Sequence, residues 1–262
     1  MHPQELIKEG RLADALAALQ NLVRTDPSNA KYRVFLFQLL SVMGQWGRAL
    51  TQLNVAGELD ADALPMVQTY RAAIQCEALR TDIFAGRRAP LIFGEPQPWL
   101  AQLVDALQHD ATDPARAAAA REQAFEAAPA SSGAIEGAPF AWLADADQRL
   151  GPVLEAIVNG RYFWIPMCRV SRIELDPPTD LRDTVWTAAT FTWTNGASGV
   201  GLIPTRYSGT VATGDESLLL ARRTEWIGDE IFGQRMLVSD AGDHPLMNAR
   251  EIVFDGDGAD NG

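Results

Sequence analysis

Residues 10–19 read GRLADALAAL, and residues 44–53 read GQWGRALTQL. Glycine begins both stretches, an Ala-Leu pair stands at the same place in each, and leucine ends both. The second copy starts 34 residues after the first, which is the period of a tetratricopeptide helix–turn–helix unit. Such units stack helices into a concave surface that holds a segment of another protein. The repeat therefore predicts a binding protein rather than an enzyme.

The composition argues against two classes of partner. The chain has 262 residues, 47% apolar content and a formal net charge of −12. Lys8 and Lys31 are its only lysines and no basic stripe is present, so we expect neither nucleic acid nor an anionic membrane as a partner. No apolar run approaches the ~20 residues of a membrane helix, and no signal peptide is recognisable. We expect a bacterial cytoplasmic protein in which Cys76 and Cys168 are free thiols.

Helical patterns run from about residue 4 to residue 128. Apolar residues from Leu12 to Val23 recur at steps of three and four, which places them on one helical face. Residues 34–43 are apolar nearly all round, so we expect a buried helix that ends at Gly44. Two repeat copies are too few for a stable stack. We therefore expect helices at 66–84, 98–108 and 114–128 to complete it as degenerate or capping units.

The fold class expected for the chain is α+β. Residues 1–128 form the predicted tetratricopeptide-like all-α domain, and residues 129–139, PASSGAIEGAP, form the predicted linker. Residues 140–254 form the predicted β-rich mixed domain, and residues 255–262 an acidic tail that we expect to be disordered. Within the β-rich domain, we expect a helix at 152–158, closed by Asn159-Gly160. The strands are predicted at 162–166, 170–175, 184–193, 200–204, 217–221 and 236–239.

The β-rich domain carries clusters of aspartate and arginine. The residues concerned are Asp145, Asp147, Arg149, Arg182, Asp183, Arg206 and Arg235. One interpretation is a catalytic or ligand site, since paired carboxylates perform general acid–base chemistry when their pKa values are raised. The other is that the arginines pair with the acids and with loop carbonyls and so fix the loops. We favour the structural interpretation, because ion-pair networks perturb acids as readily as active sites do.

Other patterns of catalytic or metal-binding residues are missing from the sequence. The histidines His2, His109 and His244 stand apart, and no Cys-x-x-Cys pair exists, so a zinc site is not expected. No serine lies in a Gly-x-Ser-x-Gly elbow. Residues 197–201, ASGVG, lack the lysine and the helix of a phosphate-binding loop and indicate a hairpin turn. We therefore predict no catalytic residue, no metal and no cofactor.

Several unusual strings occur in order along the chain. They are GEPQPW at 94–99, FAWLADADQRLGP at 140–152, NGRYFWIP at 159–166, PTDLRD at 178–183, IPTRY at 203–207, TEW at 224–226 and GQR at 233–235. In these strings the chain resembles the ImpE/SciE family, also called TagJ, whose members are accessory proteins of bacterial type VI secretion. The resemblance covers nearly the whole chain. It implies a tetratricopeptide-like part followed by a mixed domain, with no known catalysis and no assigned contact residue.

The resemblance also implies a partner. Family members are associated with the contractile sheath through an N-terminal helix of the small sheath subunit (TssB type), which connects them to sheath disassembly by the ClpV ATPase. Our first hypothesis is an adaptor that binds such a helix in a helical groove. The first helix of each repeat pair faces the concave side, which nominates Val34, Gln38 and Ser41 for partner binding.

Two alternatives to this hypothesis stay open. Val34 also fits a plain core position, because the surrounding helix is so apolar. Binding would equally suit the β-rich domain, for example by addition of a strand to an exposed sheet edge. The rival hypothesis, from another functional class, is a small-molecule-binding or hydrolytic C-terminal domain that uses the aspartate and arginine clusters.

Overall fold

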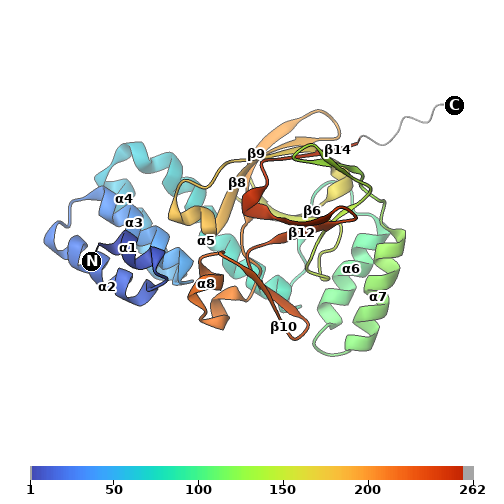
Figure 1. The fold of residues 1–262 in the computed structure, drawn as a ribbon, viewed down its shortest axis with the longest axis horizontal. Helices are drawn as coiled ribbons and strands as arrows, with labels where there is room; N and C mark the ends of the chain where they lie inside the picture. Colours follow the sequence, from blue (N-terminus) through green and yellow to red (C-terminus); the bar gives the residue numbers. More distant parts are fainter. Residues whose placement is uncertain (1, 256–262) are drawn as a thin grey trace.

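Five helices form the N-terminal part of the protein (Figure 1). The computed structural model describes residues 2–255, so the tail predicted at 255–262 lies outside the described residues apart from Asp255. The helices are α1 (Pro3–Lys8), α2 (Leu12–Thr25), α3 (Ala30–Val42), α4 (Trp46–Leu59) and α5 (Leu64–Phe84). Each of them packs against the next one along the chain, as in a tetratricopeptide stack.

The two copies of the sequence repeat have the same local structure. Gly10 follows α1 and Gly44 follows α3, and their φ angles are +81° and +67°. This left-handed conformation is the one that glycine supplies after the C-terminus of a helix. The residues that are fully buried at equivalent positions are Ala15 and Leu19 in α2, and Ala49 and Leu53 in α4. The repeated spacing in the sequence therefore marks an equivalent buried face on α2 and on α4.

The two repeat glycines differ in what surrounds them, which leads to a prediction. A Cβ at Gly44 would overlap the side chain of Val211, whereas a Cβ at Gly10 would meet nothing closer than 3.7 Å. We expect Gly10→Ala to lower the free energy of unfolding by about 1 kcal/mol, because alanine is strained at positive φ. Gly44→Ala should lower it by about 2–4 kcal/mol, because overpacking adds to the strain. Urea unfolding measures both losses, and equal losses would contradict this account.

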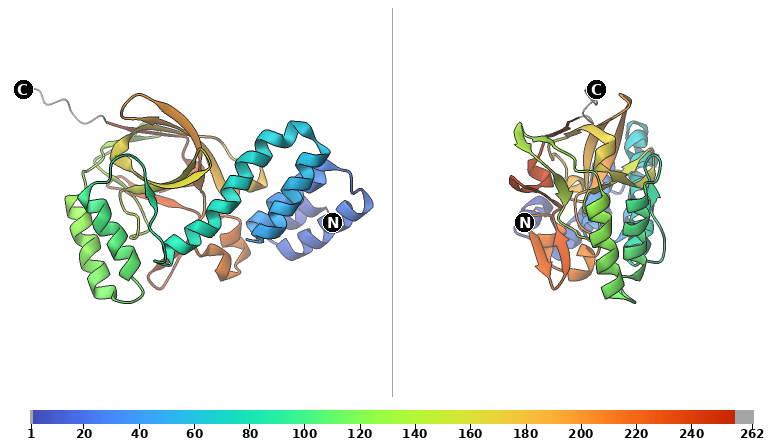
Figure 2. Two further views of the ribbon diagram at one scale, coloured as in Figure 1. Left: turned by 180° about the vertical axis from the view of Figure 1, so that it is seen from behind. Right: turned by 90° about the vertical axis from the view of Figure 1, so that its right-hand side faces the viewer.

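Helix α5 carries the chain from the repeat to the sheet-rich part (Figure 2). Neither α5 nor any other described helix combines the length and apolarity that a bilayer crossing requires. After the short strand β1 (Leu91–Ile92), helices α6 (Pro98–His109) and α7 (Pro114–Ala127) pack on each other beside the sheet (Figure 1). The prediction that these later helices complete the repeat stack holds for α5 but is wrong for α6 and α7. α5 packs on α4, whereas α6 packs on α7, and Figure 1 shows this pair on the opposite side of the sheet-rich part from α1 to α4.

A nine-stranded sheet dominates the second half of the described chain. In spatial order its strands are β1, β6 (Arg161–Pro166), β5 (Val153–Val158), β9 (Ser198–Pro204), β8 (Trp186–Trp193), β7 (Val170–Leu175), β14 (Glu251–Phe254), β2 (Gly133–Ile135) and β3 (Ala138–Phe140). β1 is parallel to β6, and every other neighbouring pair is antiparallel. The mixed α+β class is thereby confirmed.

Smaller elements complete the described fold. A second sheet has the order β13 (Gly242–Pro245), β12 (Met236–Ser239) and β4 (Leu143–Asp145), and a hairpin pairs β10 (Thr224–Ile227) with β11 (Glu230–Gly233). One further α-helix is α8 (Glu216–Leu219). The 3₁₀ helices are η1 (Ala61–Ala63), η2 (Met167–Arg169), η3 (Leu181–Thr184), η4 (Thr210–Thr213) and η5 (Leu246–Asn248).

Residues 152–158 form a strand and not the predicted helix. All six residues of β5 are buried, so its apolar side chains face both sides and the alternation that marks a half-exposed strand is absent. Asn159 and Gly160 have φ angles of 50° and 72° and join β5 to β6. An Asn-Gly pair with positive φ at both residues is the strongest short hairpin signal. It indicates a strand before the turn, although the apolar run alone also fits a helix.

Two further predictions are corrected by the structure. Residues 217–221 fall in and after α8, because the Asp215 carboxylate accepts hydrogen bonds from the amides of Ser217 at 2.8 Å and Leu218 at 3.1 Å, which caps a helix. Residues 129–139 are not a free linker. They contain β2 and most of β3, and β2 pairs with β14 inside the main sheet.

The helical repeat and the sheet share one hydrophobic core. Trp186 of β8 is fully buried, with its ring centroid 5.9 Å from that of Trp46 in α4 and 5.7 Å from that of Tyr70 in α5. The same cluster extends from Leu19 of α2 to Trp164 of β6. The repeat is therefore packed on the sheet-rich part, and its surface is free only where that part does not cover it.

Candidate functional site

A buried carboxylate lies at the junction between α5 and the main sheet. Glu155 of β5 is fully buried. Arg80 of α5 donates to it from Nε at 2.5 Å and from Nη2 at 2.8 Å, and Tyr162 donates its hydroxyl at 2.6 Å. Arg235 donates a further hydrogen bond to Oε1. Three side chains thus compensate for the loss of water around Glu155.

The junction continues on both sides of Glu155. Arg235 also pairs with Asp145 of β4, and both of these side chains are 0% exposed. Arg80 lies 3.5 Å from Glu77 of α5, whose carboxylate accepts a hydrogen bond from Trp186 Nε1 at 2.9 Å. One connected network therefore joins a helix of the N-terminal part, the main sheet and the smaller sheet.

The two buried acids have opposite pKa shifts. Burial alone would raise the pKa of Glu155, but the charges of Arg80 and Arg235 outweigh it and lower this pKa to about 2. Burial raises the pKa of Asp145 to about 6, against the opposing effect of Arg235. Glu155 is therefore a permanent anion at neutral pH. Its role is that of a counter-ion, because a general acid or base needs a pKa near the working pH.

The remaining acids of the predicted cluster are also occupied. Asp147 accepts hydrogen bonds from Arg149 Nε at 2.9 Å and Nη2 at 2.7 Å. The carboxylate of Asp183 accepts the amides of Thr179 and Asp180, each at 2.7 Å. Each nominated acid therefore already accepts hydrogen bonds from an arginine side chain or from backbone amides.

Two of the predicted arginines have no partner among the predicted acids. Arg182 pairs with Asp180 at 2.6 Å and lies over the ring of Tyr70, 4.8 Å from its centroid. Arg206 donates to the carbonyl oxygens of Val42 at 2.8 Å and Leu219 at 2.5 Å. Val42 is the last residue of α3, so Arg206 caps the C-terminus of a repeat helix.

Sequence reasoning missed Glu77, Arg80, Glu155 and Tyr162. The available signal was a charge inside an apolar stretch, as for Glu155 in the string VLEAIV, since a buried charge needs a partner. Among residues 2–255, no group of three or more His, Cys, Asp or Glu side chains is arranged to hold a metal ion. The acids of the network are all engaged by arginine, tyrosine or tryptophan side chains.

A groove of about 690 Å³ lies between α1, α3 and the segment before η3. Val34 and Gln38 of α3, two of the three predicted partner-binding residues, line it. Its apolar lining is completed by half-buried Leu22, Tyr32, Phe35 and Leu181. Open grooves with partly exposed apolar walls receive the apolar face of an amphipathic helix.

The charges around the groove are unusual for this acidic chain. Lys8 and Lys31, its two lysines, are exposed and both line the groove. The acids in the lining are Asp60 and Asp180, and Asp180 is already paired with Arg182. The groove therefore presents cations beside an apolar floor, which suits a segment that carries acidic side chains.

Ser41, the third predicted partner-binding residue, does not lie on this surface. Its side chain is fully buried, and its hydroxyl donates to the carbonyl of Phe37 at 2.9 Å. Its own carbonyl faces Arg206 Nη2 at 3.4 Å. The error arises because the sheet-rich part covers the C-terminal end of α3, which the geometry of an isolated repeat does not anticipate.

Comparisons with known proteins match both parts of the chain. A family model described as ImpE protein matches residues 137–253, and a tetratricopeptide repeat model matches residues 6–74. The chain is 57% identical over 257 residues to the type VI secretion system accessory component TagJ of Pseudomonas aeruginosa, covering 97% of this chain and 92% of that protein. The chain belongs to the ImpE family. The resemblance predicted from the ordered strings is confirmed.

A solved structure supports the fold of this ImpE-family protein. The crystal structure of protein VPA1032 from Vibrio parahaemolyticus aligns with a TM-score of 0.86 over 97% of each chain at 22% identity, which shows a shared fold. The repeat model runs from the middle of α1 into α5 and so includes most of the groove, and the ImpE model includes Glu155, Arg206 and Arg235. Arg80 lies in neither matched range, although its hydrogen bonds to Glu155 connect α5 with the main sheet.

Proposed function

We propose that this ImpE-family protein is a non-enzymatic adaptor of a bacterial type VI secretion system. Its groove between α1 and α3 holds an amphipathic helix from the N-terminus of the small sheath subunit. The observation that carries the proposal is the apolar groove lined by Val34 and Gln38 and flanked by Lys8 and Lys31. Support comes from the accessory role of the similar Pseudomonas protein and from the match to tetratricopeptide repeats.

The groove suits a helix in size and chemistry. A bound helix presents anchors at i, i+3, i+4 and i+7 on one face, and the half-buried apolar residues of the groove lie along α3 and at its edge. Acidic residues that flank those anchors would meet Lys8 and Lys31. Binding would place the adaptor in the bacterial cytoplasm and next to the sheath, where it modulates assembly or disassembly by the ClpV ATPase.

The pairing of the predicted acids argues against the rival enzymatic proposal. A hydrolytic site would need a carboxylate with an unpaired oxygen beside a substrate pocket. Asp145 instead pairs with Arg235, and Asp147 pairs with Arg149 through two nitrogens. We therefore assign these residues to the folded framework of the adaptor.

The proposal is tested by capture of the purified small sheath subunit on the immobilised full-length protein. We expect the intact subunit to be retained and a subunit without its N-terminal helix to be lost, because that helix supplies the apolar anchors. A subunit with a scrambled helix of the same composition is the matched control and should also be lost. Capture that is unchanged by deletion of the helix would overturn the helix-in-groove proposal.

A further inference from the structure

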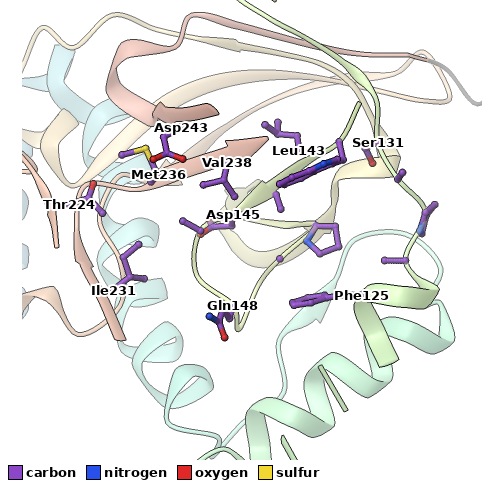
Figure 3. Close-up of a pocket in the computed structure, with 18 of the residues that line it drawn as sticks. Phe125, Ser131, Leu143, Asp145, Gln148, Thr224, Ile231, Met236, Val238 and Asp243 are labelled. Carbon is purple, nitrogen blue, oxygen red and sulfur yellow. The ribbon is translucent and has the colours of Figure 1, made fainter. Parts of the chain in front are cut away.

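A trough of about 780 Å³ lies in the sheet-rich part (Figure 3), and it shares no lining residue with the repeat groove. Figure 3 shows it between the end of α7, which carries Phe125, and the β10–β11 hairpin, which carries Thr224 and Ile231. Strands β4 and β12 form its floor, where Val238 is labelled. The network around Glu155 reaches this surface at Asp145.

The floor of the trough is an uncovered apolar sheet face. Ala144 of β4 lies opposite Val238 of β12, which lies opposite Asp243 of β13, and all three line the trough. The alternate residue Leu237 is buried in the core of the sheet-rich part, whereas Leu143 is buried but also lines the trough. The solvent side of such a sheet is normally polar. Ala144 and Val238 there indicate a face that another chain covers.

Large aromatic side chains border this floor. Trp142 is 42% exposed, Trp226 is 49% exposed and Phe125 is 37% exposed, and all three line the trough. Exposed aromatic side chains gathered on one hollow surface are typical of recognition sites. A trough whose aromatic side chains stay this exposed suits a polypeptide segment better than a small molecule, which a pocket encloses almost completely.

The charge of the lining selects the partner. Among residues 2–255, no lysine, arginine or histidine lines the trough, and Asp243 is its exposed acid. Asp145 also lines it but is neutralised by Arg235. We propose that the trough binds a short apolar segment of a partner polypeptide that carries lysine or arginine. This inference does not rest on the proposed function of the repeat groove, whose lysines select the opposite charge.

The test uses the full-length protein and two synthetic peptides in isothermal titration calorimetry. One peptide alternates valine and lysine, and the other alternates valine and glutamate. We expect the lysine peptide to bind and Val238→Lys to weaken it by about tenfold or more, because a cation then stands on the floor. Val200→Lys is the matched control, since Val200 is 72% exposed on β9 and does not line the trough.

Three results would overturn the proposal. They are failure of the lysine peptide to bind, equal binding by the Val238→Lys and Val200→Lys proteins, and equal binding of the glutamate peptide. Thermal unfolding of each variant separates lost binding from lost folding.

Discussion

Replacement of Glu155 by glutamine should lower the free energy of unfolding by about 3–5 kcal/mol, the cost of breaking a buried ion pair by removing one partner. Arg80 and Arg235 both point at this carboxylate, and the variant leaves two buried guanidinium groups without their shared anion. Glutamine has nearly the same shape, so the loss reports charge rather than packing. Urea unfolding at neutral pH measures it.

The same variant should change the pH dependence of stability. The pKa of Glu155 is lowered to about 2 in the folded protein from an ordinary value of 4.5. Its stabilisation is therefore present above pH 4.5 and is lost as the pH falls toward 2, by about 3 kcal/mol in total. The raised pKa of Asp145 acts in the opposite direction, with stabilisation lost as the pH rises toward 6. The difference between wild type and variant isolates the contribution of Glu155.

A matched control separates this effect from ordinary surface electrostatics. Glu174 also lies on a strand and pairs with an arginine, Arg172, but its side chain is 54% exposed. Glu174→Gln should change the free energy of unfolding by less than about 1 kcal/mol. A Glu155→Gln protein that is as stable as this control, at every pH, would show that the junction around Glu155 does not hold the two parts together.

Replacement of Arg206 by methionine should cost about 3–4 kcal/mol, because it leaves buried carbonyl oxygens without donors. Methionine preserves much of the volume but none of the hydrogen bonds to Val42 and Leu219. Arg206→Lys should recover part of the loss, since an ammonium group is charged but lacks the planar fork that reaches both carbonyls.

Hydrogen exchange gives the Arg206 prediction a local readout. The guanidinium holds the C-terminus of α3 against the sheet-rich part, so amide protection in α3 and α4 should fall more than protection in β7 and β8. Arg172→Met, at an exposed arginine of β7, is the control and should leave protection unchanged. A uniform loss of protection in Arg206→Met would contradict a local capping role.

The N-terminal part was predictable because its signals are local. The repeated glycines, the buried Ala15 and Ala49, and the helix boundaries all follow from spacing and from the preference of glycine for positive φ. Strand β5 was not predictable in this way, because a fully buried strand and a buried helix have the same apolar composition. The Asn159-Gly160 turn was the local signal that distinguished them.

The candidate sites depend on tertiary contacts more than the N-terminal helices do. Val34 and Gln38 were predicted from repeat geometry and do line the groove, whereas Ser41 is covered by Arg206, 165 residues away in the chain. The pairing of Arg80 with Glu155 spans 75 residues and two kinds of element. No periodicity in the sequence reports such a contact, although the presence of a charge in an apolar strand predicts that some partner must exist.

The most direct test of the central claim is a titration of the small sheath subunit's N-terminal helix, as a synthetic peptide, into the full-length protein. We predict that the wild-type protein binds the peptide. Val34→Asp should weaken binding by about tenfold or more, because it places a carboxylate on the apolar floor of the groove. Val200→Asp, at an exposed valine outside the groove, should bind like wild type. Equal affinity of the two folded variants would contradict the claim that the groove between α1 and α3 holds this helix.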